Sequence, residues 1–207
     1  MVLPADVDGR RREADRLVVT RLFEVGVNCD SVYDLVMGPT PAAAVPVLLD
    51  LLEVIEEPVI AEGIVRALRT NAAKKRAEES LIALFRRLPS GPTNGLKWAI
   101  GNTLGGLDRQ RYAAELLELA LDKAHRSDRQ MIVDALATVK GGEITQALVD
   151  LLGDDEVNGH AIGALRRRHA REALPALKGF EDHPSVWKRK IAARAILAIT
   201  RYHASRH

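Results

Sequence analysis

Trp98 and Asn102 come closest, in residue type and spacing, to a chemical site in this sequence. Residues four apart on a helix lie on the same face, so we expect this indole and this carboxamide to be exposed side by side. The amide carries no charge, and it cannot neutralise a developing cation as a carboxylate would. We therefore expect the pair to bind rather than to catalyse, and we predict no catalytic residues.

Other residues with chemical potential lack the partners that their reactions need. His160 and His169 match no metal-binding motif, and Cys29 is the only cysteine, so neither an internal disulfide nor a multi-cysteine metal site is expected. Cys29 also has no obvious paired base, and the chain contains no phosphate-binding P-loop or dinucleotide-binding glycine motif. The sequence predicts no metal and no cofactor.

The C-terminal 49 residues of the chain, residues 159–207, are strongly basic. Residues 159–207 contain 11 Lys and Arg against 3 Asp and Glu, whereas residues 1–158 contain 19 and 25. Part of this charge has a structural interpretation, because cations stabilise the C-terminal end of a helix. The alternative is contact with nucleic-acid phosphates. The candidate phosphate-binding residues are Arg166, Arg167, Arg168, Lys188, Arg189 and Lys190.

Apolar periodicity predicts that these residues are carried on helices, arranged in consecutive pairs. Aromatic residues make up only 4% of the chain, so Ala and Leu must fill the core, as in closely packed helices. Thr40 and Pro41 are typical of a helix N-terminus, where we expect the first pair to begin. The predicted first helices are 41–53, 74–88, 109–124, 143–152 and 171–180, and the second helices are 57–69, 94–104, 129–139, 156–168 and 185–202.

Two ladders of aliphatic residues support a repeat. Their members recur every 29 to 36 residues. Such a period is typical of a solenoid, in which each helical pair buries its apolar face only by stacking on its neighbours. The first-helix ladder is Leu48, Leu81, Leu116, Leu148 and Leu177, and the second-helix ladder is Leu68, Leu104, Leu136, Leu165 and Ile196.

Three segments carry a resemblance to a known family: residues 44–49 (AVPVLL), residues 173–177 (ALPAL), and residues 154–165, with DDEV followed by AIGAL. They resemble HEAT repeats, most closely the bacterial HEAT-like repeats of the phycobilisome-lyase type. The resemblance covers roughly residues 40–200. It implies an all-α, right-handed α-solenoid of about five HEAT-like pairs, with an N-terminal helical cap at residues 1–39 and one continuous array at residues 40–207.

The register of the second helices predicts which residues face outward. Positions two and six residues before each ladder member lie nearly opposite the core. Resemblance to HEAT arrays implies that this stripe lines the concave surface. Trp98 then either anchors a partner or covers a neighbouring helix, and a one-residue slip in the last register would turn Trp187 inward. The predicted protein-binding stripe is Glu62, Arg66, Trp98, Asn102, Gln130, Asp134, Lys190 and Arg194.

These observations favour a non-enzymatic scaffold or adaptor that binds a protein or peptide on its concave face. The alternative is a nucleic-acid-binding HEAT-like protein related to the alkylpurine DNA glycosylases, a family that places a Trp and an Asp one helical turn apart. Here Asn102 stands in place of that carboxylate. The N-terminus has no apolar core typical of a signal peptide, and no segment is apolar enough to span a membrane, so we expect a cytoplasmic protein. The sequence leaves the oligomeric state open.

Overall fold

The computed structural model describes residues 4–91 and 95–206, and these residues form helices and no strand. The all-α prediction is confirmed. The chain forms two compact units, Met1–Asp108 and Arg109–His207. Each unit is described separately below. The predicted division into a cap at residues 1–39 and an array from residue 40 stays a prediction, and residues 1–3 of that cap lie outside the described residues.

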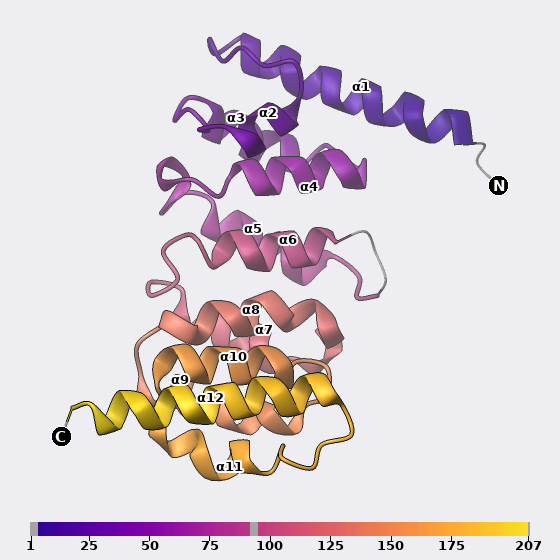
Figure 1. Cartoon of the computed structure of the whole chain (residues 1–207). Coiled ribbons are helices and arrows are strands. Elements are labelled where there is room, and N and C mark those ends of the chain that lie inside the picture. Colours follow the sequence, from indigo (N-terminus) through magenta and orange to yellow (C-terminus); the bar gives the residue numbers. More distant parts are fainter. Residues whose placement is uncertain (1–3, 92–94, 207) are drawn as a thin grey trace. The chain divides into compact units, whose positions relative to one another are not determined.

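The first unit contains two helical pairs, α3/α4 and α5/α6, preceded by α1 and α2 (Figure 1). Its second helices pack in order, since α2 contacts α4 and α4 contacts α6, while α1 lies against α3. The elements are α1 (Pro4–Phe23), α2 (Val32–Met37), α3 (Ala44–Leu52), α4 (Pro58–Ala67), the 3-10 turn η1 (Asn71–Ala73), α5 (Glu78–Arg87) and α6 (Leu96–Leu104).

The second unit contains three pairs, α7/α8, α9/α10 and α11/α12, and follows the same plan. Its second helices α8, α10 and α12 contact one another in that order, and α7 contacts α9. Its α-helices are α7 (Ala113–Leu121), α8 (Gln130–Ala135), α9 (Gly142–Asp150), α10 (Asn158–Arg168), α11 (Leu174–Lys178) and α12 (Val186–Ala204). Short 3-10 segments extend several of them: η2 (Lys123–Arg129), η3 (Leu136–Thr138), η4 (Leu151–Gly153) and η5 (Arg171–Ala173).

Side-chain caps explain where several helices begin. Ser31 accepts a hydrogen bond from the Tyr33 backbone N–H, and Asp34 completes a capping box at the start of α2. The side chains of Glu57 and Ser185 likewise accept a backbone N–H hydrogen bond at the start of α4 and of α12. The predicted N-cap at Thr40 is wrong, because α3 begins only at Ala44. The Thr40 hydroxyl instead lies 3.1 Å from the Leu35 carbonyl oxygen and 2.8 Å from that of Ala67, linking α2 to α4.

The leucine ladders predict the core correctly with one exception. The nine leucines of the two ladders are all buried, but Ile196 is only half-buried. In α12 the buried residues are Ala192, Ala195 and Ile199. The observed helices are mostly shorter than predicted, because turns and 3-10 segments occupy their ends. Asn94, where one predicted helix starts, lies outside the described residues.

A buried ion pair ties the pairs of the second unit together. The Arg129 side chain is fully buried, and its guanidinium donates hydrogen bonds to the Ala120 and Arg126 carbonyl oxygens and to Oδ2 of Asp154, 2.7 Å away. Burial raises the pKa of Asp154, but hydrogen bonds from Arg129 and from the Glu156 backbone N–H outweigh it, and the pKa is lowered. The ion pair between Arg129 and Asp154 therefore stabilises the unit only while Asp154 is ionised.

Candidate binding surface

The predicted stripe of the first unit is a cluster of one aromatic and two charged side chains. The Arg66 guanidinium donates hydrogen bonds to Glu62, with N–O distances of 2.8 Å and 2.6 Å, and lies 5.7 Å from the centre of the Trp98 ring. Trp98 remains 40% exposed. Glu62 holds the Arg66 guanidinium over the indole, where the cation is attracted to the ring.

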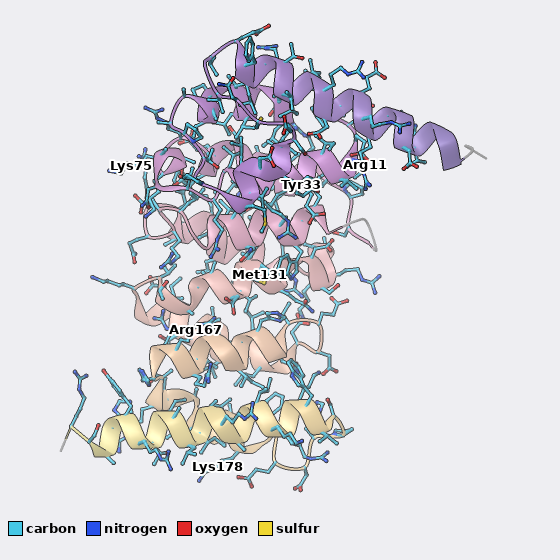
Figure 2. The ribbon with its side chains drawn as sticks, turned by 45° about the horizontal axis from the view of Figure 1, so that its top comes forward. Arg11, Tyr33, Lys75, Met131, Arg167 and Lys178 are labelled. Atoms are coloured by element: carbon cyan, nitrogen blue, oxygen red, sulfur yellow. The ribbon has the colours of Figure 1, made fainter. Side chains whose placement is uncertain are left out.

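Tyr33 adds a second aromatic ring to this cluster and was missed by the sequence analysis (labelled in Figure 2). A Cβ atom on Gly63 would lie 3.4 Å from the Tyr33 ring and 2.8 Å from Val32, so the missing side chain lets α2 approach α4. The Tyr33 hydroxyl donates to the Val59 carbonyl oxygen at 2.9 Å. Burial and the Glu62 carboxylate raise the pKa of this phenol, which therefore stays neutral and keeps donating.

Asn102 lies one turn beyond Trp98 on α6 and is half-buried. The two side chains share a face of the helix, as their spacing predicts. We use the name aromatic cluster for Tyr33, Glu62, Arg66, Trp98 and Asn102. It combines Trp, Tyr and Arg, the residue types that contribute most to binding energy at protein interfaces.

In the second unit, two of the predicted stripe residues, Gln130 and Asp134, are engaged with residues outside the stripe. Arg167 pairs with Asp134 at 2.5 Å, and the Gln130 side chain donates to the Glu156 carbonyl oxygen at 2.9 Å. Burial lowers the pKa of the His160 imidazole. The Asp134 carboxylate opposes this effect, and the Arg167 guanidinium adds to it. This part of the surface is polar and internally paired, so it offers fewer unpaired groups to a partner.

Trp187, Lys190 and Arg194 on α12 are exposed. A Cβ atom on Gly159 would lie 2.4 Å from the Trp187 ring, so the ring covers the backbone of α10 while its outer face stays in solvent. Trp187 therefore faces outward, as expected from the register of the last second helix without a slip.

Four of the six candidate phosphate-binding residues make contacts within the chain. Arg167 binds Asp134, Lys188 binds Asp155 at 3.0 Å, and Arg189 donates to the His183 carbonyl oxygen at 2.6 Å. Arg168 donates to backbone carbonyl oxygens between residues 136 and 141 and to Thr145, fastening the end of α10 to the preceding turn. Arg166 and Lys190 make no such contact among the residues described. A phosphate-binding role for this set stays a prediction.

Cys29 has the properties of an unreactive thiol. Burial raises its pKa, and the carboxylates of Asp34, Asp15 and Asp30 raise it further, which leaves little thiolate at neutral pH. Within residues 4–91 and 95–206, no group of three or more His, Cys, Asp or Glu side chains is placed to hold a metal ion. None of the helices in the same residues is long and apolar enough to cross a membrane.

Comparisons with known proteins give similarity to solved structures, two of which are described below, and to no family. No family model matches the chain, and no curated protein matches it. A designed armadillo repeat protein is 18% identical, with a TM-score of 0.45 over 96% of this chain and 100% of that one. An engineered protein of known crystal structure is 16% identical, with a TM-score of 0.46 over 91% of this chain and 97% of that one. At these values the similarity carries no argument about function.

Proposed function

We propose that this protein is a scaffold or adaptor that binds a protein or peptide segment through the aromatic cluster of its first unit. The observation that supports the proposal is Trp98, an indole that remains 40% exposed although the Arg66 guanidinium lies over its ring. An exposed, pre-positioned aromatic ring loses little freedom when a partner covers it, so most of the burial energy is available for binding.

The charged members of the cluster suggest how a partner would be oriented. Arg66 and Glu62 satisfy each other, so a segment that covers Trp98 does not have to desolvate an unpaired charge. The Glu62 and Arg66 side chains keep 20% and 34% of their surface exposed, so at the rim the Glu62 carboxylate can accept and the Arg66 guanidinium can donate further hydrogen bonds. Such a site would take an apolar side chain against the indole and polar groups around it.

The alternative of nucleic-acid binding has weaker support. Most of the candidate phosphate-binding cations already have partners within the chain, and Asn102 supplies no carboxylate beside Trp98. A nucleic-acid-binding function would show as an affinity for a short duplex that falls steeply with salt, by about 0.9 log units per log unit for each phosphate contact. We expect only weak retention that is lost near physiological salt.

Partner capture by variants tests the proposed function. Trp98→Ala combined with Arg66→Ala should abolish capture of partner proteins that the wild type retains, while the helical circular dichroism spectrum stays unchanged. Ala83→Glu is the control, because Ala83 is exposed on the first helix α5. Unchanged capture by the folded double variant would move the site away from the aromatic cluster.

The family and the compartment belong to the same proposal. The repeated helical pairs and the buried leucine ladders support a HEAT-like repeat protein, with the phycobilisome-lyase type as the resemblance in sequence. The single cysteine, whose thiol has a raised pKa, is compatible with a reducing cytoplasm. No feature of the aromatic cluster requires a cofactor for the binding function proposed.

A further inference from the structure

The outer face of α12 carries apolar residues at positions that are buried in the other second helices of its unit. α8 packs against α10, and α10 packs against α12. In each second helix we compare the ladder residue with the residue three positions before it. Both are buried in α8 (Val133 and Leu136) and in α10 (Ile162 and Leu165). In α12, Ala193 is exposed and Ile196 is half-buried. This explains why Ile196 was misplaced in the core. It also leaves an apolar strip on α12, made of Ala193, Ile196 and Leu197, that the described residues cover only in part.

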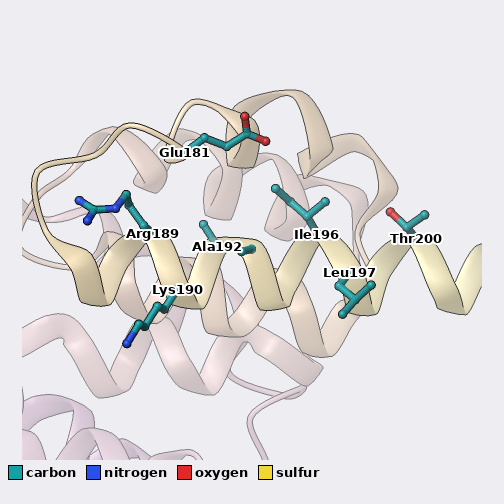
Figure 3. Close-up of a pocket in the computed structure, with 8 residues that line it drawn as sticks. Glu181, Arg189, Lys190, Ala192, Ile196, Leu197 and Thr200 are labelled. Atoms are coloured by element: carbon teal, nitrogen blue, oxygen red, sulfur yellow. The ribbon is translucent and has the colours of Figure 1, made fainter.

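The strip lies in an open groove of ≈ 560 Å³ along α12 (Figure 3). In the close-up, Ile196 and Thr200 project from the side of α12 on which Glu181 lies, and Lys190 and Leu197 project from the opposite side. Leu197 remains 49% exposed. The lining therefore has an apolar floor of alanine, isoleucine and leucine side chains with polar groups around it. The apolar members are Ala192, Ala193, Ile196 and Leu197, and the polar members are Glu181, Arg189, Lys190 and Thr200.

Cations outnumber carboxylates in the groove and beside it on α12. Lys190 lines the groove, and Arg194 and Arg201 follow it at helical spacing outside the lining; among the residues described, none of the three has an ion-pair partner. Arg189 also lines the groove, and its guanidinium donates to the carbonyl oxygens of His183 and Pro184. No carboxylate in the described part of the chain pairs with it. Glu181 is the single acidic residue in the lining.

We propose that this groove is a docking site for an acidic amphipathic helix of a partner protein. A helix laid along α12 would occupy the place that α12 itself takes on α10, with its apolar residues against Ala193, Ile196 and Leu197. Glu or Asp residues flanking that apolar stripe would pair with the cations on the edges of the groove. The surface is separate from the aromatic cluster, and the inference does not depend on the function proposed for that cluster.

Charge and shape argue against the other occupants. A second copy docked through the same face would bring Lys190, Arg194 and Arg201 close to the same cations, because a two-fold interface uses one patch on both subunits. A nucleic-acid duplex would contact the cations and leave the apolar floor uncovered. An acidic amphipathic helix would both cover the apolar residues of the groove and pair with the cations around them.

A synthetic peptide tests the proposal directly. The probe is a fluorescent helical peptide of about 20 residues, with Leu on one face at spacings of three and four and Glu beside them. Fluorescence anisotropy should show saturable binding to the full-length protein. Ala193→Glu, a change at an exposed position, should weaken binding about tenfold or more because it places a carboxylate against the acidic peptide.

A charge swap separates this site from general attraction. Lys190→Glu with Arg194→Glu should weaken binding of the acidic peptide and give binding to a peptide with Lys in place of Glu. Arg166→Glu with Arg171→Glu is the control of equal charge, because both residues are exposed outside the groove. Trp98→Ala should leave peptide binding unchanged, and this separates failure of the present proposal from failure of the aromatic cluster.

Four outcomes would overturn the assignment. One is peptide binding that neither Ala193→Glu nor the charge swap affects. Another is an intrinsic dimer, seen by sedimentation velocity, that Ala193→Glu converts to monomer, which would identify a second copy as the occupant. The last two are tighter binding, through the same residues, of vesicles containing phosphatidylglycerol or of a short DNA duplex, which would make the occupant a lipid surface or a nucleic acid.

Discussion

Replacing Arg129 by Met should destabilise the second unit more than any exposed ion-pair change. The substitution keeps the apolar stem and removes a guanidinium that is fully buried and bonds to Asp154 and to two carbonyl oxygens. The side chain of Asp154 is only 12% exposed, so its charge would lose its main partner in a poorly hydrated place. Breaking a buried pair by removing one partner costs about 3–5 kcal/mol, and we expect a loss in that range.

Urea unfolding measures this loss through tryptophan fluorescence. The chain has two tryptophans, so a Trp98→Phe background leaves Trp187 as the reporter of the second unit. Arg126→Met is the matched control, because Arg126 pairs with Glu156 at 3.3 Å while 71% of its side chain is exposed. The control should cost less than about 1 kcal/mol. An Arg129→Met loss as small as that of the control would refute the buried ion pair.

Three further predictions concern packing and pH. Leu148→Ala or Leu165→Ala should each lower the free energy of unfolding by about 2–5 kcal/mol, measured in urea, and losses near zero at both would place the ladder out of register. Gly159→Ala should displace the Trp187 ring and shift its emission maximum to the red, because the new Cβ would lie 2.4 Å from it. The pKa of Asp154 is lower in the folded than in the unfolded protein, so its carboxylate stabilises the fold fully above the unfolded-state pKa. This stabilisation is lost as the pH falls through the folded-state pKa. Asp154→Asn should therefore flatten the acid side of a plot of unfolding free energy against pH.

The sequence predicts the fold well because the repeat depends on a short-range pattern. Leucines at fixed positions in each pair face a core that every neighbouring pair shares, so the ladder can be read without knowing the tertiary structure. The pattern fails at Ile196, where the burial of a position depends on whether another helix packs against it. Thr40 failed for a similar reason: its hydroxyl contacts carbonyl groups from α2 and α4, and nothing local in the sequence specifies those partners.

The candidate surface was predictable only in part. The outward position of Trp98 follows from helical spacing, but its contact with Arg66 and the proximity of Tyr33 depend on how α2, α4 and α6 stack. The small residue Gly63 was the one available signal, because it marks a close approach between helices. The intrachain partners of Arg167 and Lys188 lie 33 residues away, a separation close to one repeat, and no pairwise signal in a single sequence identifies them.

Site-specific photo-crosslinking at position 98 tests the central claim most directly. Benzoylphenylalanine in place of Trp98 preserves an aromatic side chain and would react with whatever covers this surface in cells, and the same group at Ala83 reports the exposed face of α5. If the aromatic cluster binds a protein, position 98 should give a discrete protein adduct that mass spectrometry can identify. Position 83 should not give this adduct, and Arg66→Ala should diminish it. Adducts from Ala83 alone, or a nucleic acid joined at position 98, would contradict it.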